Sequence, residues 1–141
     1  MRILVYHYGA LRNQLTKEII DTPYAPKAIG VYSQGIKINN LVYTSGQIPI
    51  NPNNGKLIEN DIIAEINQVL NNLDAILKKG GSSLDMIIKM VVFITDISLF
   101  PQINEAFKKK FSIDPPARSV VEVSALPMDA RVEIEAIALI T

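Results

Sequence analysis

The stretch NDIIAEINQVLNNLDAILKKGG, residues 60–81, carries the strongest structural signal in the chain. Its Ile, Val and Leu residues recur at the spacing of one helix face, while Asn and Asp occupy the other face. The initial Asn-Asp pair offers an N-cap, and two lysines followed by a Gly-Gly pair suit the C-terminus. The pattern predicts an amphipathic helix of about 18–20 residues that buries its apolar stripe against another layer.

Strand-like runs precede this helix. Lys17–Thr22 predicts a short strand, and Gly30–Ile38 and Leu41–Ser45 predict two more. An Asn-Asn pair separates the last two, which predicts a hairpin because Asn tolerates the positive φ angles of tight turns. Residues 46–55 are rich in Pro, Asn and Gly, and we expect a loop there.

The chain after the helix repeats the pattern of strand and helix. Lys89–Ile94 predicts a buried strand, and Ser98 can cap a second helix whose apolar stripe runs to Phe111. Two further strands are predicted at Arg118–Val123 and Arg131–Ile140. The order β-β-β-α-β-α-β-β predicts one α+β domain, in which two helices cover one face of a five- to six-stranded mixed sheet.

Because both predicted helices lie on one face of the sheet, another surface must pack against the opposite face. The last two predicted strands are apolar on both sides, with Val120 next to Val121, and with Ile137 and Leu139 on the face that also carries glutamates. An uncovered apolar face implies a partner surface. We therefore expect a homo-oligomer in which the open faces of several sheets pack together.

Composition excludes several classes of chemistry. The 141 residues include no Cys and one His, so disulfides, thiolate metal sites, a Cys nucleophile and multi-histidine sites are excluded. That histidine, His7, lies in a poorly patterned segment, and we expect no catalytic role for it. Fourteen basic residues balance fourteen acidic ones, which argues against a general nucleic-acid binder. The apolar runs are shorter than the ~20 residues of a membrane helix, and no secretory signal is evident, so we expect a cytoplasmic protein.

Two charged positions can carry chemistry. Arg118 follows a Pro-Pro-Ala turn and opens a strand, so its planar fork can bind a carboxylate or phosphate. The alternative is a surface arginine paired with Glu122 or Glu133. Glu133 and Glu135 share one face of the last strand, where a raised pKa on one would permit acid–base work. The alternative for that pair is a solvated strand face.

Several polar residues can complete a pocket. Ser45 and Gly46 end a strand, and the hydroxyl and following N–H groups can hold an anion; a plain turn is the alternative. Tyr32 lies in GVYSQG, which lacks the spacing of a phosphate loop, so we reject nucleotide binding there. Its ring can line a pocket, as can Asn104 on the otherwise apolar face of the second helix.

Taken together, four segments resemble the Rid family, the reactive intermediate deaminases also called the YjgF or RidA family. They are AIGVYSQG (28–35), TSGQIPIN (44–51), the helix-borne Asn104 and PPARSVVEVSALPMDARVEIEAIA (115–138). The resemblance runs from about residue 17 to residue 141. Residues 1–16 lie outside it, and we interpret them as an N-terminal extension preceding a Rid-like domain at 17–141.

The resemblance implies a chorismate-mutase-like α+β fold and a homotrimer whose sheets pack into a central barrel, with active sites in clefts between subunits. The implied reaction is hydrolysis of enamines and imines, such as 2-aminoacrylate and 2-iminobutanoate, to 2-keto acids and ammonia. Pyridoxal-phosphate enzymes release such intermediates, but the Rid protein itself is implied to need no cofactor and no metal. We expect small 2-imino and 2-keto acids as ligands and no membrane or nucleic-acid partner.

The resemblance also implies roles for single residues. Arg118 matches the arginine that grips the substrate carboxylate, and Glu133 matches the glutamate that holds or activates water. Pocket-lining positions are matched by Tyr32, Ser45, Gly46 and Asn104. The chain departs from the family pattern at Val31, often proline, and at Val120, often Cys or Thr in active members.

Two other functions remain open at this point. Val120 motivates a trimer that binds small carboxylates for regulation and has no turnover. An RNA-acting protein is the third hypothesis, because such roles have been attributed to relatives. The zero net charge and the absence of a catalytic histidine weigh against this third reading.

Overall fold

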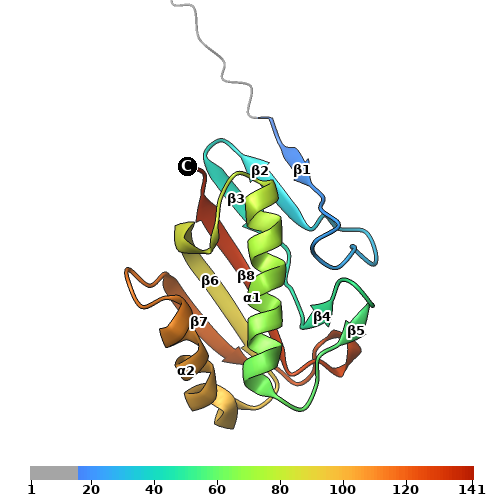
Figure 1. Ribbon diagram of the computed structural model, residues 1–141, viewed down its shortest axis with the longest axis vertical. Helices are drawn as coiled ribbons and strands as arrows, with labels where there is room; N and C mark the ends of the chain where they lie inside the picture. Colours follow the sequence, from blue (N-terminus) through green and yellow to red (C-terminus); the bar gives the residue numbers. More distant parts are fainter. Residues whose placement is uncertain (1–15) are drawn as a thin grey trace, which may run out of the picture.

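The predicted amphipathic helix is α1, Ile62–Lys79. The computed structural model describes residues 16–141, and in it α1 packs across a sheet (Figure 1). Asp61 is the N-cap: its carboxylate accepts hydrogen bonds from the N–H groups of Ile63 and Ala64. Two lysines occupy the last turn, and Gly81, at φ +86°, takes the left-handed conformation after the helix ends.

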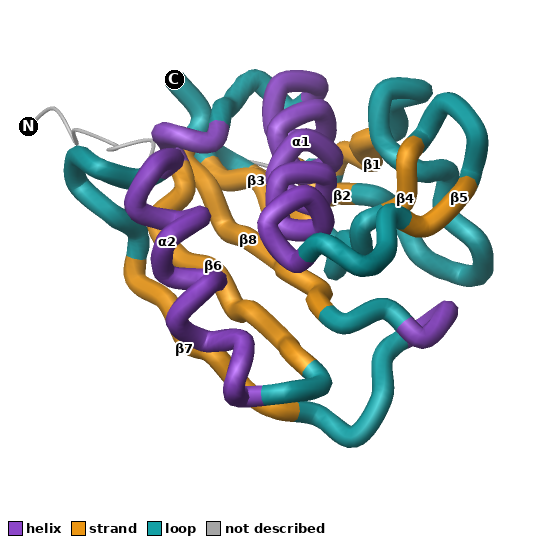
Figure 2. Tube along the Cα trace, turned by 60° about the horizontal axis from the view of Figure 1, so that its bottom comes forward, coloured by secondary structure: helices purple, strands orange, loops and turns teal. Residues whose placement is uncertain are grey.

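Six strands form the main sheet, in the order β1-β2-β3-β8-β6-β7. The β6–β7 pair is parallel and the other pairs are antiparallel, so the sheet is mixed. The crossover between β6 and β7 contains α2, and Figures 1 and 2 show both helices on the same face of the sheet. The bounds are β1 Glu18–Ile20, β2 Gly35–Ile38, β3 Leu41–Thr44, β6 Ile87–Ile94, α2 Phe100–Lys110, β7 Ala117–Glu122 and β8 Val132–Leu139. The predicted α+β class is confirmed.

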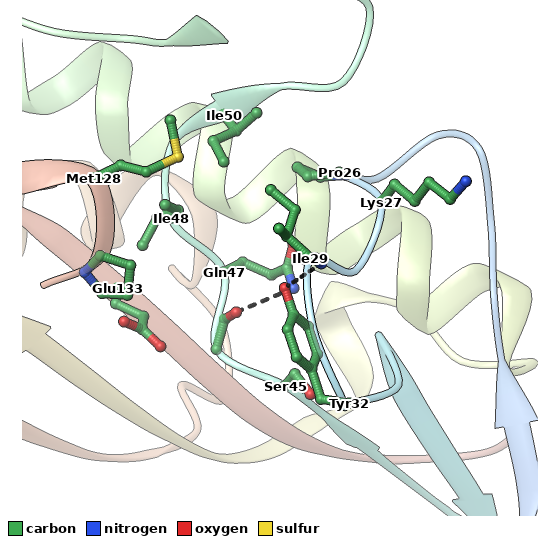
Figure 3. Close-up of a pocket in the computed structure, with 12 residues that line it drawn as sticks. Pro26, Lys27, Ile29, Tyr32, Ser45, Gln47, Ile48, Ile50, Met128 and Glu133 are labelled. Carbon is green, nitrogen blue, oxygen red and sulfur yellow. Dashed lines mark hydrogen bonds between the residues drawn. The ribbon is translucent and has the colours of Figure 1, made fainter. Parts of the chain in front are cut away.

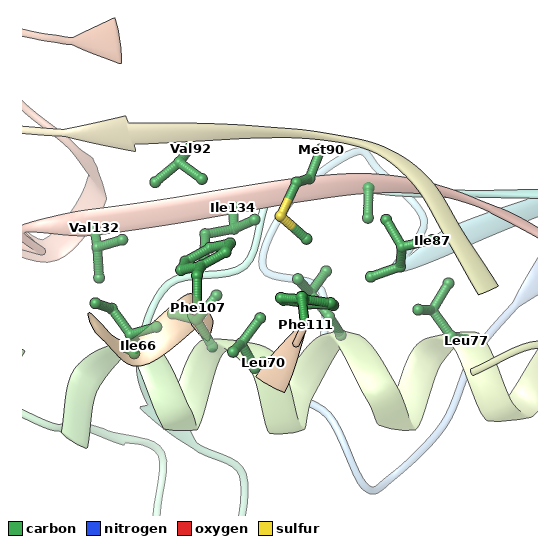
Figure 4. Packing of buried hydrophobic residues seen from close by; sticks show 14 of the residues in the cluster. Ile66, Leu70, Leu77, Ile87, Met90, Val92, Phe107, Phe111, Val132 and Ile134 are labelled. Carbon is green, nitrogen blue, oxygen red and sulfur yellow. The ribbon is translucent and has the colours of Figure 1, made fainter. Parts of the chain in front are cut away.

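The core lies between the sheet and the two helices. Alternate residues of β8, the apolar set identified from its alternation, are buried against α1 and α2 (Figure 4). Met90, Val92 and Ile94 of β6 join them with no exposed surface. On the helices, Leu70 of α1 and Phe107 of α2 belong to the same cluster. One continuous core therefore fixes which side of each strand faces the helices.

The other face of the sheet carries the remaining apolar residues. Tyr43, Ile88 and Val121 are each exposed by about two-fifths of their surface, and Phe93 and Ile137 are half-buried. Glu133 and Glu135 of β8 lie among them on this open face. The open apolar face expected from the sequence is therefore present.

The structure corrects three expectations about elements. Residues 46–55 are not entirely loop, because β4 (Ile50–Asn51) pairs with β5 (Lys56–Leu57). The strand expected at 30–38 begins only at Gly35, because the preceding segment forms a loop. The second helix begins at Phe100 after a short 3-10 turn at Ile97–Leu99, and Asp96, not Ser98, caps that turn. Two further 3-10 turns lie at Leu84–Met86 and Pro127–Asp129.

Candidate functional site

Glu133 faces a cavity at the open side of the sheet. The cavity has a volume of about 390 Å³ and is bounded by β8, the segment after β3, the loop before β2 and the 3-10 turn before β8 (Figure 3). Tyr32, Ser45 and Gly46 line it together with Glu133. Four of the residues singled out in the sequence thus lie around one cavity, which we call the carboxylate half-site.

The backbone brings Gly46 directly against the Glu133 carboxylate. Gln47 and Ile134 exchange two backbone hydrogen bonds of 2.9 and 3.0 Å, which hold the segment after β3 alongside β8. A Cβ atom at position 46 would overlap Glu133 Oε1. Any side chain at position 46 would therefore force the Glu133 carboxylate to move from this position.

Burial raises the pKa of the Glu133 carboxyl above its ordinary value, and the nearby negative charge of Glu135 raises the pKa further. Within residues 16–141, no cation or hydrogen-bond donor pairs with this carboxylate. A carboxylate with a raised pKa and free acceptor sites suits a general base.

Tyr32 and Ser45 are held by the backbone around them. The Tyr32 hydroxyl accepts a hydrogen bond of 3.1 Å from the N–H of Ile29, and half of the tyrosine surface is exposed. The Ser45 hydroxyl donates a 2.6 Å hydrogen bond to the carbonyl of Ser33. Its proton is therefore committed to the protein, and the hydroxyl can only accept a bond from a ligand.

Arg118 lies in a second cavity, of about 480 Å³, at the edge of the sheet under α2. Its Nη2 donates a 2.7 Å hydrogen bond to Oδ1 of Asn104. The guanidinium carbon lies 4.9 Å from the ring centre of Phe107 and 5.8 Å from that of Phe100. We call this arrangement the guanidinium half-site.

The Arg118 guanidinium has a fixed orientation, but only one of its N–H groups donates to a side chain among residues 16–141. Burial lowers its pKa from the ordinary value, yet an arginine remains charged. Asn104 takes one donor, and no carboxylate of residues 16–141 forms an ion pair with it. The alternative pairings suggested by the sequence are not formed: Glu122 accepts from the N–H of Ile97, and Glu133 lies elsewhere. The remaining donors can bind a carboxylate in the bidentate manner.

The two half-sites lie on opposite faces of the sheet. Arg118 pairs in register with Met90, whose side chain is in the core under the helices. Glu133 pairs with Phe93, whose side chain points to the open face. Because successive strand residues alternate between faces, Arg118 and Glu133 of one chain cannot reach the same small ligand.

The other candidate residues from the sequence also divide between the two faces of the sheet. Val120 lies two residues after Arg118 on the same face and packs against the core. Glu135 follows Glu133 on the open face. His7 and most of the proposed N-terminal extension lie outside the described residues.

Several residues of the site escaped the sequence reasoning. Phe107 was assigned to the helix stripe alone, although its ring also stacks on Arg118. Two buried amides hold the walls of the carboxylate half-site. Gln34 bonds to the backbone of Thr22, Ala25 and Pro26, and Asn72 donates to the backbone of the segment after β3. The sequence feature that could have indicated a buried amide is a polar residue between apolar positions, such as Asn72 on α1.

Among residues 16–141, no group of three or more His, Asp or Glu side chains is arranged to hold a metal ion. Over the same range, no helix has the length and apolar character needed to cross a membrane.

Comparison with known proteins identifies the family. The family model described as endoribonuclease L-PSP matches residues 22–140. A Rid family protein of unknown function from Yersinia pestis is 51% identical, with a TM-score of 0.86 over 89% of this chain and 100% of its own. TdcF of E. coli, solved with bound serine, is 44% identical, with a TM-score of 0.83 over 88% of this chain and 99% of its own.

A relative with a named activity also matches. The 2-iminobutanoate/2-iminopropanoate deaminase of Mus musculus is 39% identical over 127 residues, which cover 90% of this chain and 94% of the relative. The family match spans the described strands from β2 to β8 and both half-sites. The chain belongs to the Rid family.

Proposed function

We propose that the chain hydrolyses 2-imino acids, and the enamines that equilibrate with them, to 2-keto acids and ammonia. One observation carries the proposal most directly: each chain holds an unpaired carboxylate with a raised pKa beside one cavity and an oriented, partly free guanidinium beside another. The named activity of the mouse relative supports the substrate class, and the serine bound to TdcF supports a small ligand with a carboxylate.

The two groups suffice for the chemistry. The free donors of Arg118 in one subunit bind the substrate carboxylate and place C2 near Glu133 of the neighbouring subunit. The Glu133 carboxylate accepts a proton from water while the water oxygen bonds to C2. The C=N π electrons move to nitrogen, and Glu133 returns the proton to that nitrogen, which gives a carbinolamine. The proton of the new hydroxyl group then transfers through Glu133 to the nitrogen, the C–N bond breaks, and ammonia leaves as the carbonyl forms. Orientation contributes several kcal/mol to such a reaction, and a positioned base typically contributes about 10²–10⁴-fold.

The arrangement of the sheet supports a site shared between two copies of the chain. Arg118 and Glu133 of one chain lie on opposite faces, so the proposed reaction needs the guanidinium half-site of one subunit beside the carboxylate half-site of its neighbour. The open apolar face, with Val121 and Tyr43 partly exposed, supplies surface for this association. We propose the homotrimer that the family resemblance implies, with three equivalent sites between subunits.

The test couples the protein to a threonine dehydratase and follows the decay of 2-iminobutanoate. The wild-type protein should accelerate the decay, and Arg118→Ala should abolish most of the acceleration. Lys110→Ala is the matched control, because it removes an exposed cation at the end of α2 that lines neither cavity. Absence of acceleration by the wild type, or full acceleration by Arg118→Ala, would refute the proposal.

A second function is a regulatory trimer that binds small carboxylates without turnover. The observation that favours it is Val120, an apolar residue beside Arg118 where active relatives often carry Cys or Thr. The experiment is a titration with 2-ketobutyrate. Binding that Arg118→Ala abolishes, in a protein that does not accelerate imine decay, would select this function over the deaminase.

A further inference from the structure

One fully buried charge lies outside both half-sites. Glu65, in the first turn of α1, is 1% exposed, and it is the only buried charged side chain among residues 16–141. Its carboxylate accepts two hydrogen bonds from Arg131: Nη2 donates to Oε1 at 2.5 Å, and Nε donates to Oε2 at 3.2 Å. A fork of two such bonds fixes the plane of the guanidinium as well as its position. The pair therefore sets where Arg131 points, and the reaction derived above uses neither residue.

The Glu65–Arg131 pair joins three elements at one end of the sheet. Arg131 directly precedes β8, and its carbonyl accepts a 3.1 Å hydrogen bond from the N–H of Thr95, which directly follows β6. The start of β8 and the N-terminal end of α1 lie at the same end of the molecule (Figure 1). An apolar pair of similar volume often stabilises such a junction as well as a buried ion pair does. Stability alone therefore does not account for the two charges.

The Arg131 guanidinium lies among carboxylates. They come from the segments around it: Glu65 and Asp61 of α1, Asp96 of the turn after β6, and Glu59 and Asp129, which line a small cavity with Arg131. The hydrogen bond with Glu65 raises the pKa of Arg131 most; burial lowers it, and the charges of Glu65, Asp61 and Asp96 raise it further. Of these five carboxylates, Glu65 alone bonds to the guanidinium, so Glu65 decides its orientation.

Released from α1, Arg131 would have Glu133 as its nearest strand neighbour of opposite charge. One residue separates the two, and alternate residues of a strand project to the same face. The pKa of Glu133 is raised by burial and by Glu135, and no cation of residues 16–141 lowers it. Lys27 lines the same cavity and forms no ion pair with Glu133. Across the proposed site, Arg118 of the neighbouring subunit is taken by the substrate carboxylate.

We propose that Glu65 is a positioning residue for the base: it holds Arg131 at the end of β8 and so keeps this guanidinium from pairing with Glu133. The inference rests on the deaminase function proposed above, because it assumes that Glu133 works as an unpaired carboxylate. Glu65 touches no substrate and acts only through Arg131. Unlike the half-sites, the pair is complete within one chain, and Glu65 is buried before any subunit is added.

The experiment is the pH profile of kcat/KM for 2-iminobutanoate in Glu65→Gln. The amide keeps the shape of the side chain but removes the charge that holds Arg131. An arginine that turns to Glu133 lowers the pKa of that carboxyl, so the acid limb should move to lower pH by about one pH unit. The paired carboxylate is a weaker base, and kcat/KM at neutral pH should fall about tenfold. Glu59→Gln is the matched control, because it makes the same change at an exposed glutamate of the same small cavity, and its profile should equal that of the wild type.

A double variant separates this role from simple bracing of the fold. Glu65→Gln combined with Arg131→Gln also removes the released cation and leaves two amides that can bond to each other. Its acid limb should return to the wild-type position, and its kcat/KM should exceed that of Glu65→Gln. Loss of a structural brace alone would leave the double variant no better than the single one. Glu65→Asp keeps the charge but withdraws the carboxylate by one methylene, so the limb should move in the same direction and by less; it gives the same test if Glu65→Gln does not fold.

The titration of the Glu133 carboxyl can be followed without any assay of activity. Its carbon NMR signal, assigned by its absence in Glu133→Gln, should shift with the acid limb in each variant. A titration and a limb that stay in place in Glu65→Gln and Glu65→Asp, or a shift that persists in the double variant, overturn the inference. Failure of the wild type to accelerate imine decay overturns the deaminase function instead, and the carboxyl titration then still tests whether Glu65 keeps Arg131 from Glu133.

Discussion

The guanidinium half-site and the carboxylate half-site are held in opposite ways. Arg118 is oriented by an amide on α2 and by two aromatic rings, so the covered face of the sheet presents a cation in a fixed geometry. Glu133 lies on the open face over Gly46, and within residues 16–141 no group compensates its charge. Arg118, the proposed anchor for the substrate, is thus oriented before any substrate binds. Glu133, the proposed base, has no partner among residues 16–141, so its pKa stays raised. Neither half is a complete site.

The sharpest way to test the carboxylate half is Glu133→Gln. The amide keeps the shape and removes the base, so kcat/KM for 2-iminobutanoate should fall by about 10²–10⁴-fold. Glu135→Gln is the matched control and should keep most of the activity at neutral pH.

Thermal unfolding shows whether Glu133→Gln still folds. Because the folded pKa of Glu133 is raised, its ionised form is a cost to stability that appears as pH rises from the ordinary glutamate pKa through the folded pKa. The amide removes this cost, so Tm at neutral pH should be unchanged or higher. Full activity in Glu133→Gln would show that this carboxylate is not the base.

Mixed oligomers test whether the two halves come from different subunits. Arg118→Ala and Glu133→Gln should each be inactive alone. If chains mix at random, about a quarter of all interfaces combine an intact guanidinium half with an intact carboxylate half, so roughly that fraction of wild-type activity should return. The measurement is the activity after co-expression in equal amounts. No recovery in trimers shown to be mixed would contradict a site shared between subunits.

Gly46→Ala tests the close approach of the Glu133 carboxylate to the backbone. The added Cβ would occupy the position of Glu133 Oε1 and push the base aside, which should lower kcat by about 10²-fold. Gly55→Asn is the control: no atom lies within 4 Å of a Cβ built there, and Asn tolerates its positive φ. Equal activity in the wild type and Gly46→Ala would show that the position of Glu133 is not critical.

Glu135→Gln should have the smallest effect and changes only the electrostatics of the carboxylate half. The negative charge of Glu135 helps to raise the pKa of Glu133, so its removal lowers that pKa. The base works when ionised, and activity is lost as pH falls through its pKa. The acid limb of the kcat/KM profile should therefore move to lower pH in Glu135→Gln. A limb that stays in place would assign it to another group.

Local sequence patterns predicted most of the helices and strands, because the periodicity that indicates each of them lies within a short consecutive stretch of sequence. The spacing of apolar residues in α1 and the alternation in β8 state directly which side is buried, and the structure confirms both. The short β4–β5 pair was missed because two-residue strands show no periodicity. The buried amides Gln34 and Asn72 were also missed, because their partners lie 8–12 and 22–24 residues away in the chain.

The sequence by itself determined the fold class, the apolar open face and the identity of the candidate residues, Arg118 and Glu133 foremost. Only the tertiary structure decided that these two residues belong to different half-sites. The reason is the strand order: β7 pairs with β6 in parallel after the α2 crossover, and β8 lies on the other side of β6. The face on which each strand presents a given residue follows from register across the sheet, and no local pattern encodes that register.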